Sequence, residues 1–128
     1  MVTGTLGDQE LALLRFVAAE GPISVGEAVE RFGAPRGLAR STVLTVMERL
    51  RKKKRLTRRR AGGVYLYQSR EGMEALLSGV VRSFVETALE GSVSPFVAYL
   101  SEPGRMSESE IRDLERLVKK LRSKEGER

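Results

Sequence analysis

The chain has 128 residues, with 23 Lys and Arg against 17 Asp and Glu, and a formal net charge of +6. It contains no Cys and no His, which removes disulfides, thiolate chemistry, the commonest general base and the commonest metal ligands, so we expect no catalytic residue, no metal and no cofactor. No apolar run approaches the ~20 residues that span a bilayer, and the N-terminus lacks a signal-peptide pattern, so we expect a cytoplasmic protein without membrane insertion.

The first two helices are indicated by apolar periodicity and by their boundaries. One helix is predicted over residues 8–20, where the apolar stripe is stopped by a Gly-Pro pair. A second helix is predicted over residues 25–32, because Ser24 and Glu27 have the spacing of a capping box. The turn-forming residues 33–37 should then separate it from a third helix.

The third helix begins at about Arg40 and has two distinct faces. Apolar side chains recur at i, i+3, i+4 and i+7, namely Val43, Val46, Met47 and Leu50. The opposite face begins with short side chains and ends in cations. Short side chains let a helix approach base edges, and cations suit the flanking phosphates. The predicted base-contacting residues are Ser41, Thr42, Leu44 and Thr45.

A basic segment and a hairpin follow this helix. Eight of the ten residues 51–60 are basic and none is acidic. Gly62-Gly63 then separates the end of the basic segment from a short segment rich in aromatic residues, Val64-Tyr65-Leu66-Tyr67, which predicts a β-hairpin. A helix followed by a basic hairpin is the arrangement of a winged helix-turn-helix, although a basic run can also be only a solvated helix end. The predicted phosphate-contacting residues are Arg40, Arg49, Lys52, Lys53, Arg58, Arg59 and Arg60.

Charge is segregated along the chain, which bears on the partner. Residues 36–60 hold eleven Lys or Arg and one Glu, whereas the remainder carries more acidic than basic residues. Such a local excess favours a polyanion, with double-stranded DNA as the first candidate. Two alternatives stay open: an RNA-binding winged helix, against which we expect Tyr65 and Tyr67 to pack inward, and a protein–protein adaptor whose helical tail is the active part.

The composition changes after residue 69. Three amphipathic helices are predicted, over about 73–90, 92–102 and from 107 onward. They cannot readily bury such broad apolar faces alone, so we expect a homodimer, the alternative being that they fold back on the winged helix. The chain is therefore predicted to be mainly α, with a winged-helix DNA-binding domain at 1–69 and a helical dimerisation domain at 70–128. The predicted dimer-interface residues are Leu77, Val81, Phe84, Val85, Phe96, Leu100, Leu114, Val118 and Leu121.

The chain resembles the penicillinase-repressor family of BlaI/MecI type, to which the copper-responsive CopY repressors also belong. The most specific pieces are the segment from Ser41 to Leu50 with the Lys/Arg-rich turn after it, the segment from Val64 to Tyr67, and the spacing from Glu110 to Leu114. The resemblance implies an N-terminal winged helix, a C-terminal three-helix dimerisation region and repression at palindromic operators. It also implies that two threonines lie on the DNA-contacting helix, Thr42 and Thr45.

The resemblance also raises the question of how the DNA is released. In the antibiotic-resistance members, a metalloprotease system triggers cleavage of an Asn-Phe bond in the middle helix of the dimerisation region. An ungapped count from Gly91 reaches Tyr99 and Leu100 here, so this bond is a candidate cleavage site and a regulatory protease is a candidate partner. Residue 99 is not Asn, and the alternative is that both side chains only pack in a core. The absence of Cys excludes the metal-sensing tail of the copper branch, and release by a small ligand stays open.

Overall fold

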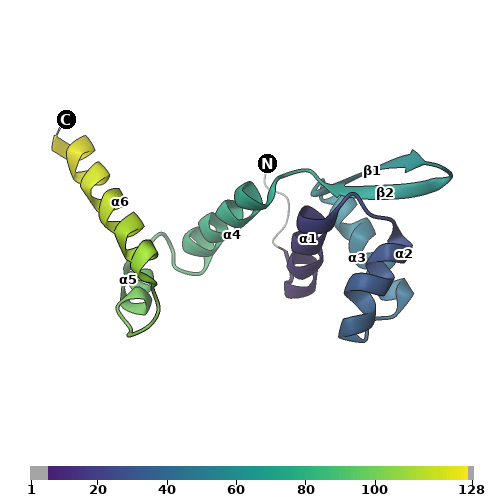
Figure 1. Ribbon diagram of the computed structural model, residues 1–128, viewed down its shortest axis with the longest axis horizontal. Helices are drawn as coiled ribbons and strands as arrows, with labels where there is room; N and C mark the ends of the chain where they lie inside the picture. Colours follow the sequence, from purple (N-terminus) through teal and green to yellow (C-terminus); the bar gives the residue numbers. More distant parts are fainter. Residues whose placement is uncertain (1–5, 127–128) are drawn as a thin grey trace. The chain divides into compact units, whose positions relative to one another are not determined.

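The computed structural model describes residues 6–126 and is mainly helical, with one β-hairpin, as the sequence predicts (Figure 1). Contacts divide the chain into two compact units, Met1–Val81 and Arg82–Arg128. The first unit holds a winged-helix arrangement, and the second holds the C-terminal helices. Within the described residues, no helix combines the length and the apolar content needed to cross a bilayer.

The first helix, α1, spans Asp8–Glu20 and matches the predicted range. Its first turn is closed by Glu10, whose carboxylate accepts a hydrogen bond from the backbone N–H of Gly7 at 3.0 Å. The side chains of Leu13, Leu14 and Val17 are buried. These three aliphatic side chains join α1 to the core, and burying each of them stabilises the folded state by about 1.5–3 kcal/mol.

The second helical segment is longer than predicted. The capping box is confirmed, because Ser24 Oγ accepts a hydrogen bond from Glu27 N–H at 3.1 Å and Glu27 Oε1 accepts one from Ser24 N–H at 2.9 Å. However, α2 (Val25–Ala28) continues as a π-helical turn, η1 (Val29–Gly33), and a 3-10 turn, η2 (Ala34–Arg36). The prediction that residues 33–37 form a turn was wrong. Pro35 lies in the first turn of η2, and a helix tolerates proline there because the N–H that proline lacks would have no partner within the helix. The helical segment ends at Gly37, which has φ of 68°.

The third helix, α3, spans Arg40–Lys52, and its predicted buried stripe is confirmed. The four stripe residues lie in the core: Val43, Val46, Met47 and Leu50. Gly33 permits close approach of η1 to this helix, since a Cβ added there would lie 2.8 Å from Val43 Cγ2. The core of the first unit therefore packs α1, the α2–η1 segment and α3 together.

The hairpin consists of β1 (Leu56–Ala61) and β2 (Val64–Ser69), paired antiparallel. Gly62 and Gly63 have φ of 58° and 82°, the two positive values that a two-residue hairpin turn requires. The base of the hairpin is fixed to the helical core. Tyr67 N–H donates to Ile23 C=O at 2.7 Å, and Ile23 N–H donates to Tyr67 C=O at 2.9 Å.

The C-terminal helices are α4 (Met73–Thr87), α5 (Ser94–Leu100) and α6 (Glu108–Gly126), so all three predicted helices are present. The second capping box is confirmed by hydrogen bonds of 3.2 and 2.9 Å between Ser107 and Glu110. The contact-based division falls inside α4, twelve residues beyond the predicted boundary at residue 69. It falls there because Met73 and Leu76, at the start of α4, pack with the core of the first unit.

Candidate nucleic-acid interface

The outer face of α3 carries three of the four predicted base-contacting residues in exposed positions. Ser41, Leu44 and Thr45 are exposed, with Leu44 at 41%. Thr42 is half-buried at the edge of the apolar stripe. The face therefore presents two small hydroxyl side chains and one apolar side chain, and a helix of this kind can bring its backbone near base edges. A leucine at such a face can contact a thymine methyl group.

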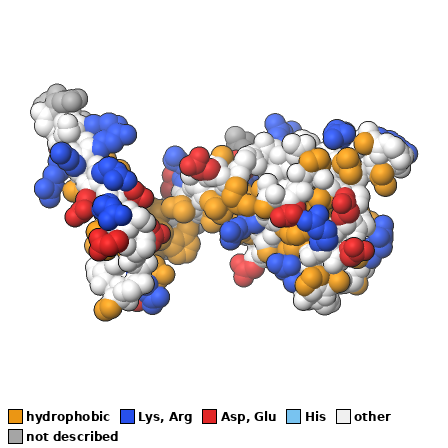
Figure 2. Space-filling model, viewed as in Figure 1, with side chains coloured by type: hydrophobic (Ala, Val, Ile, Leu, Met, Phe, Trp, Pro, Cys, Tyr) orange, Lys and Arg blue, Asp and Glu red, His pale blue; other side chains and the backbone are white. Residues whose placement is uncertain are grey.

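The predicted phosphate-contacting residues divide into two groups. Five are exposed and form no ion pair within residues 6–126: Arg40, Arg49, Lys52, Arg59 and Arg60. The other two, Lys53 and Arg58, are half-buried and paired with carboxylates. Figure 2 shows Lys and Arg side chains along the projecting hairpin. The basic run is uniform in sequence, but its members differ in how readily they can reach a phosphate.

The two faces of the hairpin carry different cations. Arg58 is opposite Tyr67 and Arg60 is opposite Tyr65, so these four side chains share one face. Arg59 alternates to the other face. The guanidinium carbons of Arg58 and Arg60 lie 4.0 and 5.2 Å from the centroid of the Tyr65 ring. These distances are those of cation–π contacts, which restrict the orientation of both arginines.

The two tyrosines do not both pack inward, so that prediction was half wrong. Tyr67 is 1% exposed and belongs to the core, whereas Tyr65 is 39% exposed and lies under the arginines. Burial is the main reason that the pKa of Tyr67 is raised. The difference arises because Tyr67 is at the base of the hairpin, opposite Ile23, and Tyr65 is two residues nearer the tip.

Glu48 connects α3 to the hairpin. Its Oε2 accepts a hydrogen bond from Tyr67 Oη at 2.8 Å and one from Arg58 Nη1 at 3.3 Å. Its Oε1 accepts from Arg51 Nη2 at 3.0 Å. The hydrogen bond from Arg51 is the main reason that the pKa of Glu48 is lowered, so this carboxylate is ionised at neutral pH. Glu48 was not among the predicted site residues, and its i, i+3 spacing to Arg51 is the one local signal of this network.

A second carboxylate holds the end of α3 to the start of α1. Lys53 Nζ donates to Glu10 Oε1 at 2.8 Å, and Glu10 is 8% exposed. The hydrogen bond from Lys53 is the main reason that the pKa of Glu10 is lowered. Lys53 therefore has a structural partner, and a phosphate would have to compete with Glu10 for it.

A groove with several charged side chains in its lining runs between the outer face of α3, the start of α2 and the hairpin. Its volume is about 680 Å³, and its lining includes Arg40, Leu44 and Glu48 from α3 together with Arg58, Arg60 and Tyr65 from the hairpin. The start of α2, at Ser24, also lines it and was not predicted as part of the site. Helix and hairpin thus form one continuous surface. Residues 6–126 contain no group of acidic side chains suited to a metal ion.

The C-terminal helices present their predicted interface residues largely to solvent. Six are exposed, namely Val81, Phe84, Leu100, Leu114, Val118 and Leu121. Three are half-buried, namely Leu77, Val85 and Phe96. The rings of Phe84 and Phe96 are in contact, with centroids 5.9 Å apart. In the second unit, no described side chain is buried, so the helices of this unit do not cover one another's apolar side chains.

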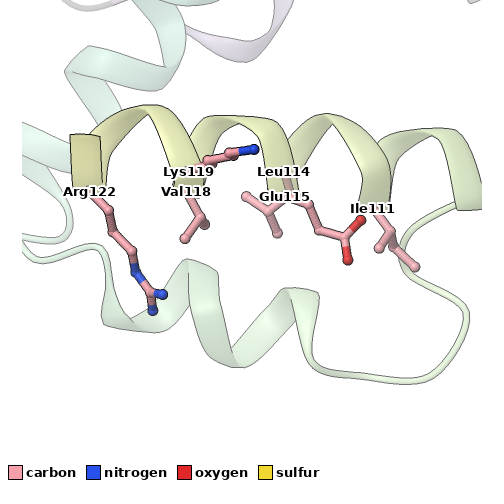
Figure 3. Close-up of a pocket in the computed structure, with 6 residues that line it drawn as sticks. All are labelled: Ile111, Leu114, Glu115, Val118, Lys119 and Arg122. Carbon is pink, nitrogen blue, oxygen red and sulfur yellow. The ribbon is translucent and has the colours of Figure 1, made fainter. Parts of the chain in front are cut away.

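The last helix carries an apolar groove on one face. Ile111, Leu114 and Val118 line it together with the stems of three charged residues, and its volume is about 400 Å³. Figure 3 shows Leu114 and Val118 pointing to the same side of α6. The candidate cleavage residues lie in α5, where Tyr99 and Leu100 are 50% and 36% exposed. They are not buried in the single chain, and the Arg105 guanidinium lies 4.8 Å from the Tyr99 ring centroid.

The fold and this surface define a winged-helix protein of the DNA-binding regulator class, in which an exposed helical face and a basic hairpin lie side by side. The chain matches the family model described as "Penicillinase repressor" over residues 6–120. It therefore belongs to the penicillinase repressor family, which consists of non-enzymatic transcriptional regulators that bind DNA and dimerise.

Solved structures support the fold. The chain is similar to a MarR family protein from Bacillus stearothermophilus, with a TM-score of 0.53 and 20% identity, covering 96% of this chain and 77% of that chain. It is also similar to a MarR/EmrR family transcriptional regulator from Acinetobacter sp. ADP1, with a TM-score of 0.46, 20% identity and coverage of 96% and 78%. At this identity, the first likeness bears on the fold alone, and the second carries no argument. No curated protein matches the chain.

Proposed function

We propose that this regulator is a homodimeric repressor that binds a palindromic operator. The outer face of α3 enters the major groove, and the hairpin contacts the sugar–phosphate backbone beside it. The observation that carries the proposal is the exposure of Ser41, Leu44 and Thr45 on α3, since Leu44 lines one groove together with the basic hairpin. Small side chains on the helix allow close approach to bases, and the surrounding cations neutralise phosphates.

The exposed cations are the principal phosphate contacts in this proposal. They are Arg40, Arg49, Lys52, Arg59 and Arg60. Lys53 and Arg58 take part only if they leave Glu10 and Glu48, which requires replacing short ion pairs of 2.8 and 3.3 Å. Neutralising one phosphate changes the slope of log K against log salt by about 0.9. The number of cations that contact phosphates can therefore be estimated from binding constants measured over a range of salt concentrations.

The C-terminal helices, residues 70–128, form the dimer interface in this proposal. The uncovered apolar side chains of α4, α5 and α6 support it, because a second copy would bury them. A two-fold dimer presents two α3 helices about one DNA turn apart, ~34–36 Å, and so selects a palindrome. Proteolysis at Tyr99–Leu100 by a regulatory protease is one route of release, since both residues are exposed in α5 and a cut there separates α6 from the rest.

The deciding experiment is footprinting of the purified protein on its own upstream DNA, with excess random duplex as competitor, across a salt series. We expect a protected palindrome with two half-sites about one turn apart. Competition with duplex RNA in the same assay addresses the RNA-binding alternative. Loss of all protection under competitor, or preference for RNA, would refute the operator assignment.

A matched pair of variants separates base contacts from phosphate contacts. Arg59→Ala should weaken binding to all duplexes similarly and lower the salt slope by about one, because Arg59 is an exposed cation on the hairpin with no ion pair to residues 6–126. Thr45→Ala should change the order of preference among operator variants and leave the slope unchanged. If Arg59→Ala altered sequence preference without a change in slope, the phosphate assignment would be wrong.

A further inference from the structure

Glu48 is the acidic residue of an otherwise basic groove. Among the described residues that line the groove between α3 and the hairpin, the charged side chains are Arg40, Arg58, Arg60 and Glu48. A carboxylate beside a DNA-binding surface repels phosphates, so its presence there needs a compensating role. Glu48 lies on the exposed side of α3, one turn after Leu44.

The contacts of Glu48 show which cations it neutralises. Its two carboxylate oxygens accept from Arg51 Nη2 at 3.0 Å and from Arg58 Nη1 at 3.3 Å. Arg58 is further held by Tyr67 Oη at 3.2 Å and by its stacking on Tyr65. One carboxylate therefore restrains two of the eight basic residues of the 51–60 run.

The pairing leaves these side chains within reach of DNA. The side chains of Glu48, Arg51 and Arg58 are 29%, 35% and 28% exposed. A phosphate can thus approach the arginines, but it must displace an ionised partner that is already hydrogen-bonded. Phosphate binding gains its free energy from the release of condensed counterions, and a neutralised arginine releases fewer of them.

From this geometry we infer that Glu48 is a specificity-determining residue that withholds Arg51 and Arg58 from sequence-independent phosphate binding. The inference rests on the proposed DNA-binding function. On random duplex the protein can shift to any register in which freed arginines meet phosphates. On an operator, base contacts fix the register, so freed arginines gain less. Glu48 thereby lowers affinity for random DNA more than affinity for the operator.

The test compares Glu48→Gln with wild type on random duplex and on the protected upstream sequence, by fluorescence anisotropy across a salt series. Gln keeps the size of Glu and an oxygen that accepts from Tyr67. Each freed arginine should steepen the salt slope on random duplex by about 0.9, which is about an eightfold gain in affinity at about 0.1 M salt. The operator should gain less, so the ratio of specific to random affinity should fall.

Two further variants make the result specific to this cluster. Glu20→Gln removes the same charge from the exposed pair with Arg31, which is outside the groove, and should leave the slope at the wild-type value. The double variant Glu48→Gln with Arg58→Gln should return the slope toward wild type by about 0.9. Thermal melting of each variant reports folding separately.

The outcomes distinguish the inference from the function on which it rests. A steeper slope on random duplex for Glu48→Gln, reversed in the double variant and accompanied by a smaller gain on the operator, supports the inference even if the melting temperature falls. An unchanged slope, uniformly weaker binding or an equal gain on both DNAs by Glu48→Gln, with normal wild-type binding, overturns the inference and leaves the DNA-binding function standing. Failure of the wild-type protein to bind duplex DNA overturns both.

Discussion

The hydroxyl of Tyr67 offers a direct test of how the hairpin is attached to α3. Tyr67→Phe removes one oxygen from a ring that is 1% exposed, and the ring itself keeps its place in the core. Two hydrogen bonds are lost: the one that Tyr67 Oη donates to Glu48 at 2.8 Å and the one that it accepts from Arg58 at 3.2 Å. Both partners are charged, and a hydrogen bond to a charged group contributes about 1.5–3 kcal/mol.

The expected loss is that of one such bond rather than two. Glu48 and Arg58 stay paired with each other at 3.3 Å, and both are partly exposed, so water can satisfy the freed positions. We expect the free energy of unfolding to fall by about 1.5–3 kcal/mol. With a urea m-value of about 1–3 kcal/mol/M, the midpoint of urea unfolding should fall by about 1 M at constant m.

Tyr65→Phe is the matched control for this measurement. Tyr65 is 39% exposed, and within the described residues its hydroxyl forms no hydrogen bond, while its ring would still stack under Arg58. Tyr65→Phe should change the free energy of unfolding by no more than about 0.5 kcal/mol. If the two variants unfold at the same urea concentration, the hydroxyl of Tyr67 does not fasten the hairpin to α3, and the reasoning about the Glu48 cluster fails with it.

Two other predictions concern acid stability and dimerisation. The hydrogen bond from Lys53 lowers the pKa of Glu10, so this pair stabilises the fold at pH values above 4.5, the ordinary pKa of Glu, and its contribution is lost as the pH falls through the lowered pKa. In Glu10→Gln the melting temperature should therefore depend less on pH in the acid range. Melting temperatures that fall with pH in parallel with wild type would contradict the assignment. Leu114→Asp should yield a monomer by analytical ultracentrifugation. Lys120→Asp should stay dimeric, because at 100° per residue it lies about 120° round α6 from Leu114, on the charged side of the helix. A dimeric Leu114→Asp would remove α6 from the interface.

The local elements could be predicted because their signals lie within a few residues. The α3 stripe follows from 3.6-residue periodicity, the two capping boxes from a three-residue spacing, and the hairpin turn from Gly62-Gly63. The second helical segment was predicted too short because Gly33 and Pro35 were interpreted as terminators. Pro35 instead lies in the first turn of η2, where its missing N–H has no partner to lose.

The charge network could not be predicted in the same way. The partners of Glu48 in the hairpin are 10 and 19 residues away, and Lys53 is 43 residues from Glu10. No periodicity relates positions so far apart, so a uniform basic run gave no indication of which cations are neutralised. The predicted base-contacting residues came from the helical wheel alone, and the structure shows Ser41, Leu44 and Thr45 exposed, outside the core.

None of residues 82–126 has a buried side chain, which has a consequence for how this regulator responds to its own abundance. If the C-terminal helices bury their apolar faces only by pairing, then their folding and the pairing of two chains are a single event governed by mass action. A tenfold dilution then removes about 1.4 kcal/mol from the stability of the pair. At low concentration the chains would be unpaired, with their C-terminal helices unfolded and accessible to proteases. At high concentration pairing would protect these helices, so the cellular concentration of the protein would set its lifetime.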